Sequence, residues 1–77
     1  MNLSDIPPAL RSHFDQTSEV LQGKLRIRDT RVSVEQILEL LEAGVHSADI
    51  IHSFPSVPAS AVSAVERLAA HCALTIL

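Results

Sequence analysis

Residues 23–34 read Gly-Lys-Leu-Arg-Ile-Arg-Asp-Thr-Arg-Val-Ser-Val, and the rest of this 77-residue chain is organised around them. Leu25, Ile27 and Val32 alternate with charged or polar neighbours. A period of two places successive side chains on opposite faces of a strand. The stretch therefore predicts a short β-hairpin with one apolar face, one basic face and a tip at Asp29-Thr30.

The basic face of this hairpin holds four of the chain's six Lys and Arg side chains, namely Lys24, Arg26, Arg28 and Arg31. Residues 24–31 carry +3, four bases less Asp29, within a total of −3, so the remainder carries −6. A globally acidic chain is a poor nonspecific binder of nucleic acid, because affinity for DNA depends mainly on phosphate neutralisation. A local basic edge can still contact phosphates or the carboxylates of another protein.

A helix is predicted directly after the hairpin, over residues 34–43. Ser33 and Gln36 have the spacing of a capping box, and Gly44 suits the residue that follows a helix. The residues at the spacing of one helical face are Val34, Ile37, Leu38 and Leu41.

Two further helices are predicted downstream. Ser47 is placed to cap a helix over 48–53, and Pro55 and Pro58 separate it from a third helix over about 59–72. The third helix should bury Val62, Val65, Leu68, Ala69 and Cys72. The apolar residues 73–77 either continue this helix or pair as a strand.

The first 22 residues give weaker signals. Ser4 or Asp5 can cap a short helix that contains Pro7 and Pro8 in its first turn. Residues 19–21 are expected to add a strand to the hairpin.

These elements predict one domain over residues 1–77, with an N-terminal arm or short helix at 1–18, the hairpin at 19–33 and a three-helix bundle at 34–73. The fold class is mainly α: a helix-turn-helix or homeodomain-like three-helix domain preceded by a short β-hairpin. In such a domain the third helix is offered to a DNA groove, and Ser60, Ser63 and Arg67 are the candidate groove-facing residues. That helix presents a single Arg beside Glu66 and no Lys, Asn or Gln, so it only weakly indicates base reading.

Composition limits the functional class. The chain is 47% hydrophobic, with two Phe and no Trp or Tyr, which favours an aliphatic core. So much apolar surface on a small chain favours a partner protein or a homodimer that covers part of it. One cysteine, no leader-like start and no apolar run of about 20 residues predict a cytoplasmic protein without a membrane span.

Catalytic and metal-binding patterns are not found. The four histidines lack the i, i+4 spacing of a helical zinc site, and Cys72 has no matching His and Asn. The two glycines cannot form a phosphate loop. We therefore expect no enzyme activity, no cofactor and no metal site.

The motifs Gly23-Lys24, Ile27-Arg28 and Thr30-Arg31, followed by an Ala-Gly turn and Phe54-Pro55, resemble the small bacterial family catalogued as domain of unknown function 433. The resemblance covers about residues 19–72. It implies a homeodomain-like, often dimeric, antitoxin-like protein, often of VapB type, that is paired with a PIN-like nuclease toxin. The chain departs from the family pattern at Leu25, Asp29 and Ser33, where the family has Pro, Gly and Pro. At the second of these, Asp must tolerate positive φ or use another turn type.

For the hairpin, the resemblance suggests a contact site for the toxin. The toxin holds divalent metal with clustered carboxylates, and an inserted guanidinium can form bidentate pairs with those oxygens. We expect Arg28 and Arg31 to do this, supported by Lys24, Arg26 and Thr30. The alternatives are a solvated strand face whose arginines pair with nearby glutamates, a grip on operator DNA as a stand-alone regulator, or a structural dimerisation module.

Overall fold

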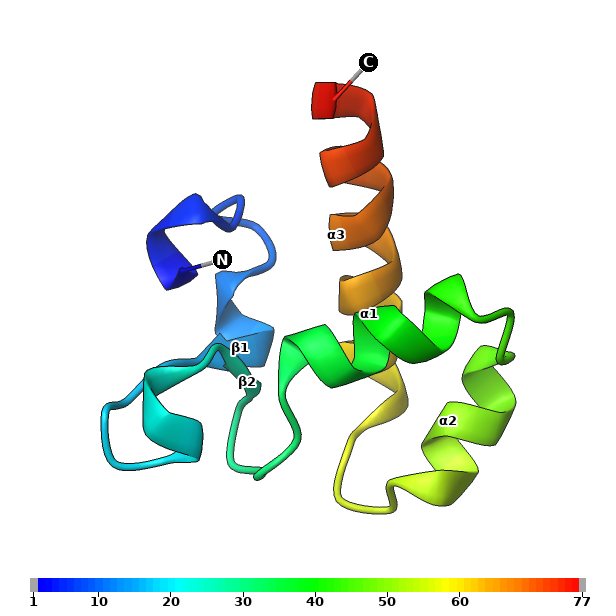
Figure 1. Ribbon diagram of the computed structural model, residues 1–77, viewed down its shortest axis with the longest axis horizontal. Helices are drawn as coiled ribbons and strands as arrows, with labels where there is room; N and C mark the ends of the chain where they lie inside the picture. Colours follow the sequence, from blue (N-terminus) through cyan, green and yellow to red (C-terminus); the bar gives the residue numbers. More distant parts are fainter. Residues whose placement is uncertain (1, 77) are drawn as a thin grey trace.

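The computed structural model describes residues 2–76, with side chains for residues 2–71. Three helices, α1 (Val34–Glu42), α2 (Ser47–Ser53) and α3 (Ala59–Ile76), follow a two-stranded antiparallel sheet of β1 (Phe14–Asp15) and β2 (Arg26–Ile27). In Figure 1 the N-terminal segment and the sheet lie on one side of α3, and α2 lies on the other. The predicted fold class, a mainly α three-helix domain preceded by a small hairpin, is confirmed. None of the described helices is long and apolar enough to cross a membrane.

Helix α1 begins at the predicted residue and ends one residue before the predicted end, with Ala43 as its C-cap. The Ser33 hydroxyl accepts a hydrogen bond from the backbone N–H of Gln36 at 3.0 Å, which satisfies one of the free donors of the first turn. Gly44 follows the helix with φ +87°, a value that a residue without Cβ adopts without strain. Val34 and Ile37 are buried, Leu38 and Leu41 are half-buried, and α1 as a whole packs against α3, α2 and β2.

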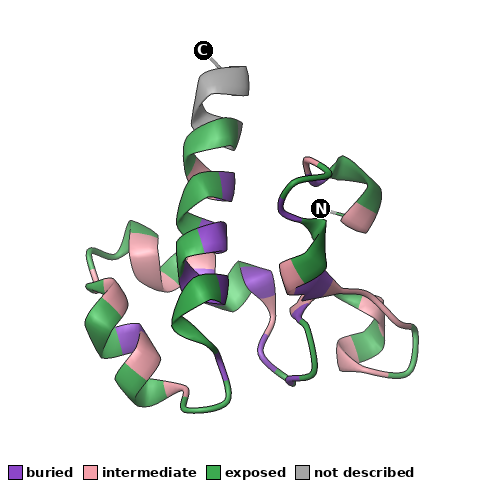
Figure 2. Cartoon of the chain, turned by 180° about the vertical axis from the view of Figure 1, so that it is seen from behind, coloured by how far each residue is buried: buried purple, intermediate pink, exposed green. Residues whose placement is uncertain are grey.

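The other two helices differ from prediction at their ends. Ser47 does not cap α2: it is the first helical residue, because the N–H groups of Asp49 and Ile50 already bond to the carbonyl of His46. Helix α3 continues through Ile76, and its buried side carries Val62, Val65 and Leu68 (Figure 2). The prediction that Cys72 is buried lies outside the described side chains.

The predicted N-terminal helix is replaced by two single 3₁₀ turns, η1 (Leu3–Asp5) and η2 (Arg11–His13). The cap of η1 is Asn2, rather than Ser4 or Asp5, and its backbone N–H donates to the Asp5 carboxylate at 3.0 Å. Pro7 and Pro8, which have no N–H to give to a helix, separate the two turns.

The predicted strand at residues 19–21 is wrong. The strand that pairs with β2 is β1, with Phe14 opposite Ile27 and Asp15 opposite Arg26. The chain between them instead makes a left-handed turn, η3 (Leu21–Gly23), with φ of 51°, 56° and 81° at its three residues. The side chain of Gln16 stabilises this turn through a hydrogen bond from Nε2 to the Gly23 carbonyl at 2.9 Å.

The core joins every part of the domain. The fully buried side chains include Phe14 from β1, Ile27 from β2, Ile37 from α1, Ile50 from α2 and Val65 from α3. The sheet is thus seated on the helices by its apolar face, as the alternation in residues 25–32 predicts. The opposite face of the hairpin is left to carry its polar and charged groups.

Candidate partner interface on the hairpin

The predicted hairpin forms, but its tip lies one residue earlier than Asp29-Thr30. Ile27 N–H donates to the Val32 carbonyl at 2.9 Å, Val34 N–H donates to the Leu25 carbonyl at 3.0 Å, and residues 27–30 make the turn. The central residues of this turn are therefore Arg28 and Asp29. We call it the 27–30 turn.

Asp29 occupies the second central position of the turn with φ +62°. Position i+2 with positive φ is the position where type II turns favour Gly or Asn, and Asp is among the residues that tolerate it. The left-handed conformation explains why glycine suits this position in the family pattern. Asp29 therefore keeps positive φ, the first of the two alternatives that the sequence left open.

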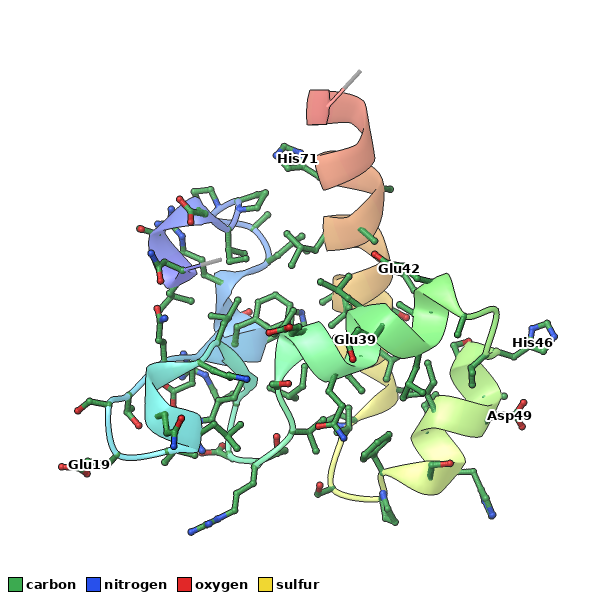
Figure 3. The ribbon with its side chains drawn as sticks, in the orientation of Figure 1. Glu19, Glu39, Glu42, His46, Asp49 and His71 are labelled. Atoms are coloured by element: carbon green, nitrogen blue, oxygen red, sulfur yellow. The ribbon has the colours of Figure 1, made fainter. Side chains whose placement is uncertain are left out.

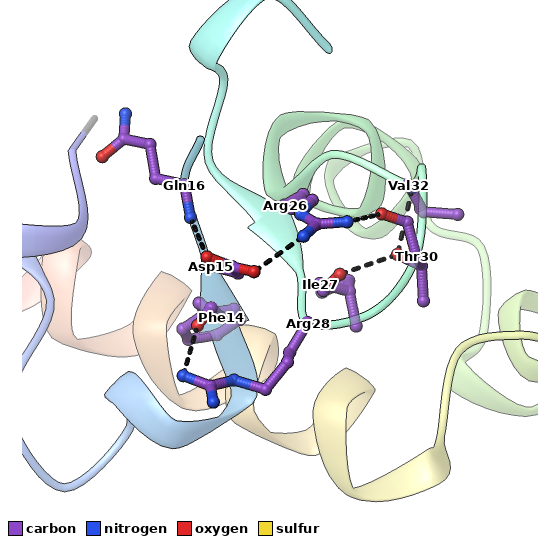
Figure 4. Close-up of polar contacts among 8 residues, drawn as sticks. All are labelled: Phe14, Asp15, Gln16, Arg26, Ile27, Arg28, Thr30 and Val32. Carbon is purple, nitrogen blue, oxygen red and sulfur yellow. Dashed lines mark hydrogen bonds and ion pairs between the residues drawn. The ribbon is translucent and has the colours of Figure 1, made fainter. Parts of the chain in front are cut away.

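Thr30, which was predicted to support the partner contact, is a structural residue of the turn. It is 6% exposed. Its hydroxyl donates to the Ile27 carbonyl at 2.8 Å and accepts from the Val32 N–H at 3.1 Å (Figure 4). These bonds tie the two arms of the hairpin together and use the only donor of the hydroxyl, which is buried.

Arg26 is also engaged within the fold. Its guanidinium forms an ion pair with the Asp15 carboxylate at 2.7 Å and donates to the Thr30 carbonyl at 2.9 Å (Figure 4). The Arg26 side chain is 14% exposed, and its Nε is buried without a hydrogen-bond partner in the described part of the chain. Arg26 thus links β1, β2 and the 27–30 turn, and it cannot reach a partner without breaking these bonds.

Asp15 is the residue of this site that sequence reasoning missed. The Arg26 guanidinium holds the pKa of the Asp15 carboxyl below its ordinary value of 3.8, and a 2.7 Å hydrogen bond from the Gln16 backbone N–H acts in the same direction. The signal available in the sequence was Phe14-Asp15, an apolar and an acidic residue in the alternation of a strand.

The remaining basic side chains are exposed. Arg28 reaches back to the Phe14 carbonyl with Nη2 at 3.3 Å, a long bond that leaves most of its donors free. The side chains of Arg31 and Lys24 make no hydrogen bond or ion pair with any residue that the structure describes. Lys24 also borders a hollow of about 260 Å³ over Leu25, Val34, Glu35 and Leu38.

The carboxylates of the helices do not neutralise these cations. Figure 3 labels Glu39 and Glu42 on α1, Asp49 on α2 and Glu19 before η3, and all four are exposed. Among the described residues, neither Arg28 nor Arg31 pairs with a glutamate. The alternative in which the hairpin arginines pair with nearby glutamates therefore does not describe this surface.

The candidate groove-facing residues of α3 lie on a different element and share a hollow with the N-terminal segment. Ser60, Ser63 and Arg67 are exposed, as predicted. They line a hollow of about 300 Å³ together with Ala9, Leu10, His13 and Ala64. The predicted DNA-facing side of α3 therefore lies next to the chain around η2.

The family model described as Protein of unknown function (DUF433) matches residues 15–69, more than half of the chain. The match begins at Asp15, the partner of Arg26, and includes both hairpin arms and all of α1 and α2. No curated protein and no solved structure gives a significant match.

Proposed function

Because the chain belongs to the DUF433 family of proteins of unknown function, and because Arg28 in its 27–30 turn and Arg31 directly after the turn are exposed, we propose that it is an antitoxin-like protein that binds and neutralises a PIN-like nuclease toxin. The two proteins would form a cytoplasmic toxin–antitoxin pair. The observation that carries the proposal is the Arg31 guanidinium, which is exposed and uses none of its five donors on the described chain.

The chemistry of the proposed contact follows from the two partners. A nuclease of this type gathers carboxylates to hold a divalent cation, and these carboxylates repel one another when the cation is absent. A guanidinium among them forms two parallel, charge-assisted hydrogen bonds and takes the place of the metal. The rigid turn supports this role, because Arg26 and Thr30 fix the backbone from which Arg28 and Arg31 project.

Co-expression with the product of the adjacent reading frame tests the proposal. We expect a stable complex, relief of toxicity, and inhibition of ribonuclease activity by the purified chain. Substitution Arg31→Gln should weaken the complex by about 30-fold or more, since removing one partner of a buried charge pair costs about 2–5 kcal/mol. Arg31→Lys should recover only part of the affinity, because an ammonium cannot make the bidentate contact.

Arg67→Gln is the matched control, because it removes an exposed arginine from α3 instead of the hairpin. Addition of Mg²⁺ at constant ionic strength should weaken the wild-type complex if the arginine and the metal compete for one site. The proposal would be overturned by the absence of a complex, or by an Arg31→Gln variant that inhibits as well as the wild type.

Operator binding is a second proposed activity, supported by the exposed positions of Ser60, Ser63 and Arg67 on α3. It predicts salt-sensitive binding to the DNA upstream of its own gene, and weaker binding for Arg67→Gln and Arg28→Gln. A gel-shift titration from low to moderate salt measures it. No binding even at low salt would exclude this activity.

A homodimer is also proposed, because several half-buried apolar side chains remain on α1, on α2 and at the C-cap of α2, including Leu38, Leu41, Ile51 and Phe54. Sedimentation equilibrium of the purified chain tests it. A monomer at all concentrations would contradict it.

A further inference from the structure

The hollow between η2 and α3 combines two basic side chains and two hydroxyls from separate parts of the chain. His13 comes from η2, and Ser60, Ser63 and Arg67 come from α3. The three residues of α3 lie at i, i+3 and i+7, which places them in one stripe along the helix. Apolar side chains of Ala9, Leu10 and Ala64 complete the lining of this hollow of about 300 Å³. We call it the η2–α3 groove.

The polar groups of the η2–α3 groove have unused donors. Within the described part of the chain, neither the imidazole nitrogens of His13 nor the guanidinium of Arg67 makes a hydrogen bond or ion pair. The hydroxyls of Ser60 and Ser63 have no side-chain hydrogen bond there either. Two contacts fix the position of His13: its backbone carbonyl accepts a hydrogen bond from the Arg28 N–H at 3.0 Å, and its ring packs edge-on against Phe14.

Among the residues whose side chains are described, no carboxylate lines the groove. Glu66 is next to Arg67 in sequence, but adjacent helical residues point about 100° apart, and Glu66 is not among the lining residues. A site with an arginine, a histidine and two hydroxyls, and without an acid, is complementary to a group that only accepts hydrogen bonds and carries negative charge.

We propose that the η2–α3 groove binds the phosphate group of a small phosphomonoester or of inorganic phosphate. A phosphate offers three strong acceptor oxygens at about −1.5 to −2 charge, which matches a groove lined by donors from both η2 and α3. A phosphate of a nucleic-acid backbone has the same oxygens, so the test separates the two sources. This inference does not depend on the proposed toxin complex, which uses Arg28 of the 27–30 turn and Arg31.

Titration of the full chain with inorganic phosphate at constant ionic strength, followed by backbone and imidazole NMR shifts, tests the proposal. We expect saturable shifts centred on His13, Ser60 and Ser63. Arg67→Gln should weaken binding about tenfold or more, as expected for loss of a charge-assisted hydrogen bond, and Arg67→Lys should weaken it less. Ser63→Leu should also abolish binding by filling the groove while it leaves both basic side chains in place.

Arg31→Gln is the matched control and should bind phosphate as the wild type does, because Arg31 does not line the groove. A parallel titration uses a short DNA duplex. Duplex binding without phosphate binding would overturn the proposal in favour of a nucleic-acid surface. Shifts that do not saturate, or that are equal in Arg67→Gln, would overturn it as a general salt effect.

Discussion

Removal of the Thr30 hydroxyl should open the hairpin tip. Thr30→Val keeps the branched shape but leaves the buried Val32 N–H without its 3.1 Å acceptor. The Ile27 carbonyl keeps one bond, since it also accepts the N–H of residue 30 at 3.1 Å. The cost should therefore be that of one buried unsatisfied donor, about 1–3 kcal/mol.

That cost is large for this chain. A domain of 77 residues is expected to have an unfolding free energy of about 4–12 kcal/mol, and each kcal/mol corresponds to roughly 4–8 °C in Tm. Thr30→Ser is the matched control: it keeps the hydroxyl and loses one methyl group, at about 1 kcal/mol or less.

Urea denaturation at 25 °C and amide hydrogen exchange are the two assays. In Thr30→Val the Val32 amide should exchange faster than global unfolding allows, because its acceptor is gone, while Thr30→Ser should keep its protection. The reasoning would be refuted if the two variants lost equal stability, or if the Val32 amide stayed protected in Thr30→Val.

Three other changes follow from the same region. Asp29→Gly should raise the unfolding free energy, measured by urea denaturation, by up to about 1 kcal/mol. Glycine adopts positive φ without the strain that Asp29 bears, and this gain outweighs the added conformational freedom of the unfolded chain. A lower unfolding free energy in Asp29→Gly would contradict this prediction. Ser33→Ala should lower the unfolding free energy by about 1 kcal/mol, because the hydrogen bond from the Gln36 N–H to the Ser33 hydroxyl is lost. Ser33→Asp should keep that stability, since a carboxylate also caps a helix, and thermal melts measure both variants. The lowered pKa of Asp15 means that its pairing with Arg26 stabilises the fold above the ordinary value of 3.8, and that this contribution disappears as pH falls through the lower folded value. The Tm difference between wild type and Asp15→Asn should therefore be constant at neutral pH and shrink below about pH 4; a difference that grows in acid would exclude this account.

Helix α1 could be predicted closely because its signals are local. Ser33 caps it, Gly44 ends it, and the apolar spacing between them belongs to one helical face. The pairing of β1 with β2 could not be predicted in the same way, since the two strands are separated by a turn that uses left-handed Leu21 and Gln22. Neither residue type favours positive φ, so the sequence pointed instead to a strand at residues 19–21.

The candidate site shows the same division. The charge pattern was enough to predict the basic hairpin. It could not distinguish Arg26, which is bonded within the fold, from the exposed Arg28 and Arg31. That separation depends on Asp15, which is eleven residues from Arg26 and meets it only through the sheet register. Similarly, His13 and Arg67 line the same groove only because the chain around η2 packs against α3.

Some hairpin residues are bonded within the fold and others are exposed, so substitutions in the two groups should affect stability and partner binding differently. The Arg26 guanidinium is bonded to Asp15 and to the Thr30 carbonyl, so substitution of Arg26 should lower the unfolding free energy of the domain. Partner affinity should fall only to the extent that the fold is destabilised. Arg31 has no described partner, so its substitution should lower affinity with stability unchanged. Asp29 retains the positive φ that favours glycine at this position, so Asp29→Gly should change neither the direction of Arg31 nor its affinity. If Asp29→Gly altered partner binding as strongly as Arg31→Gln, the contact would have to include the Asp29 carboxylate, and a surface defined by arginines alone would be wrong.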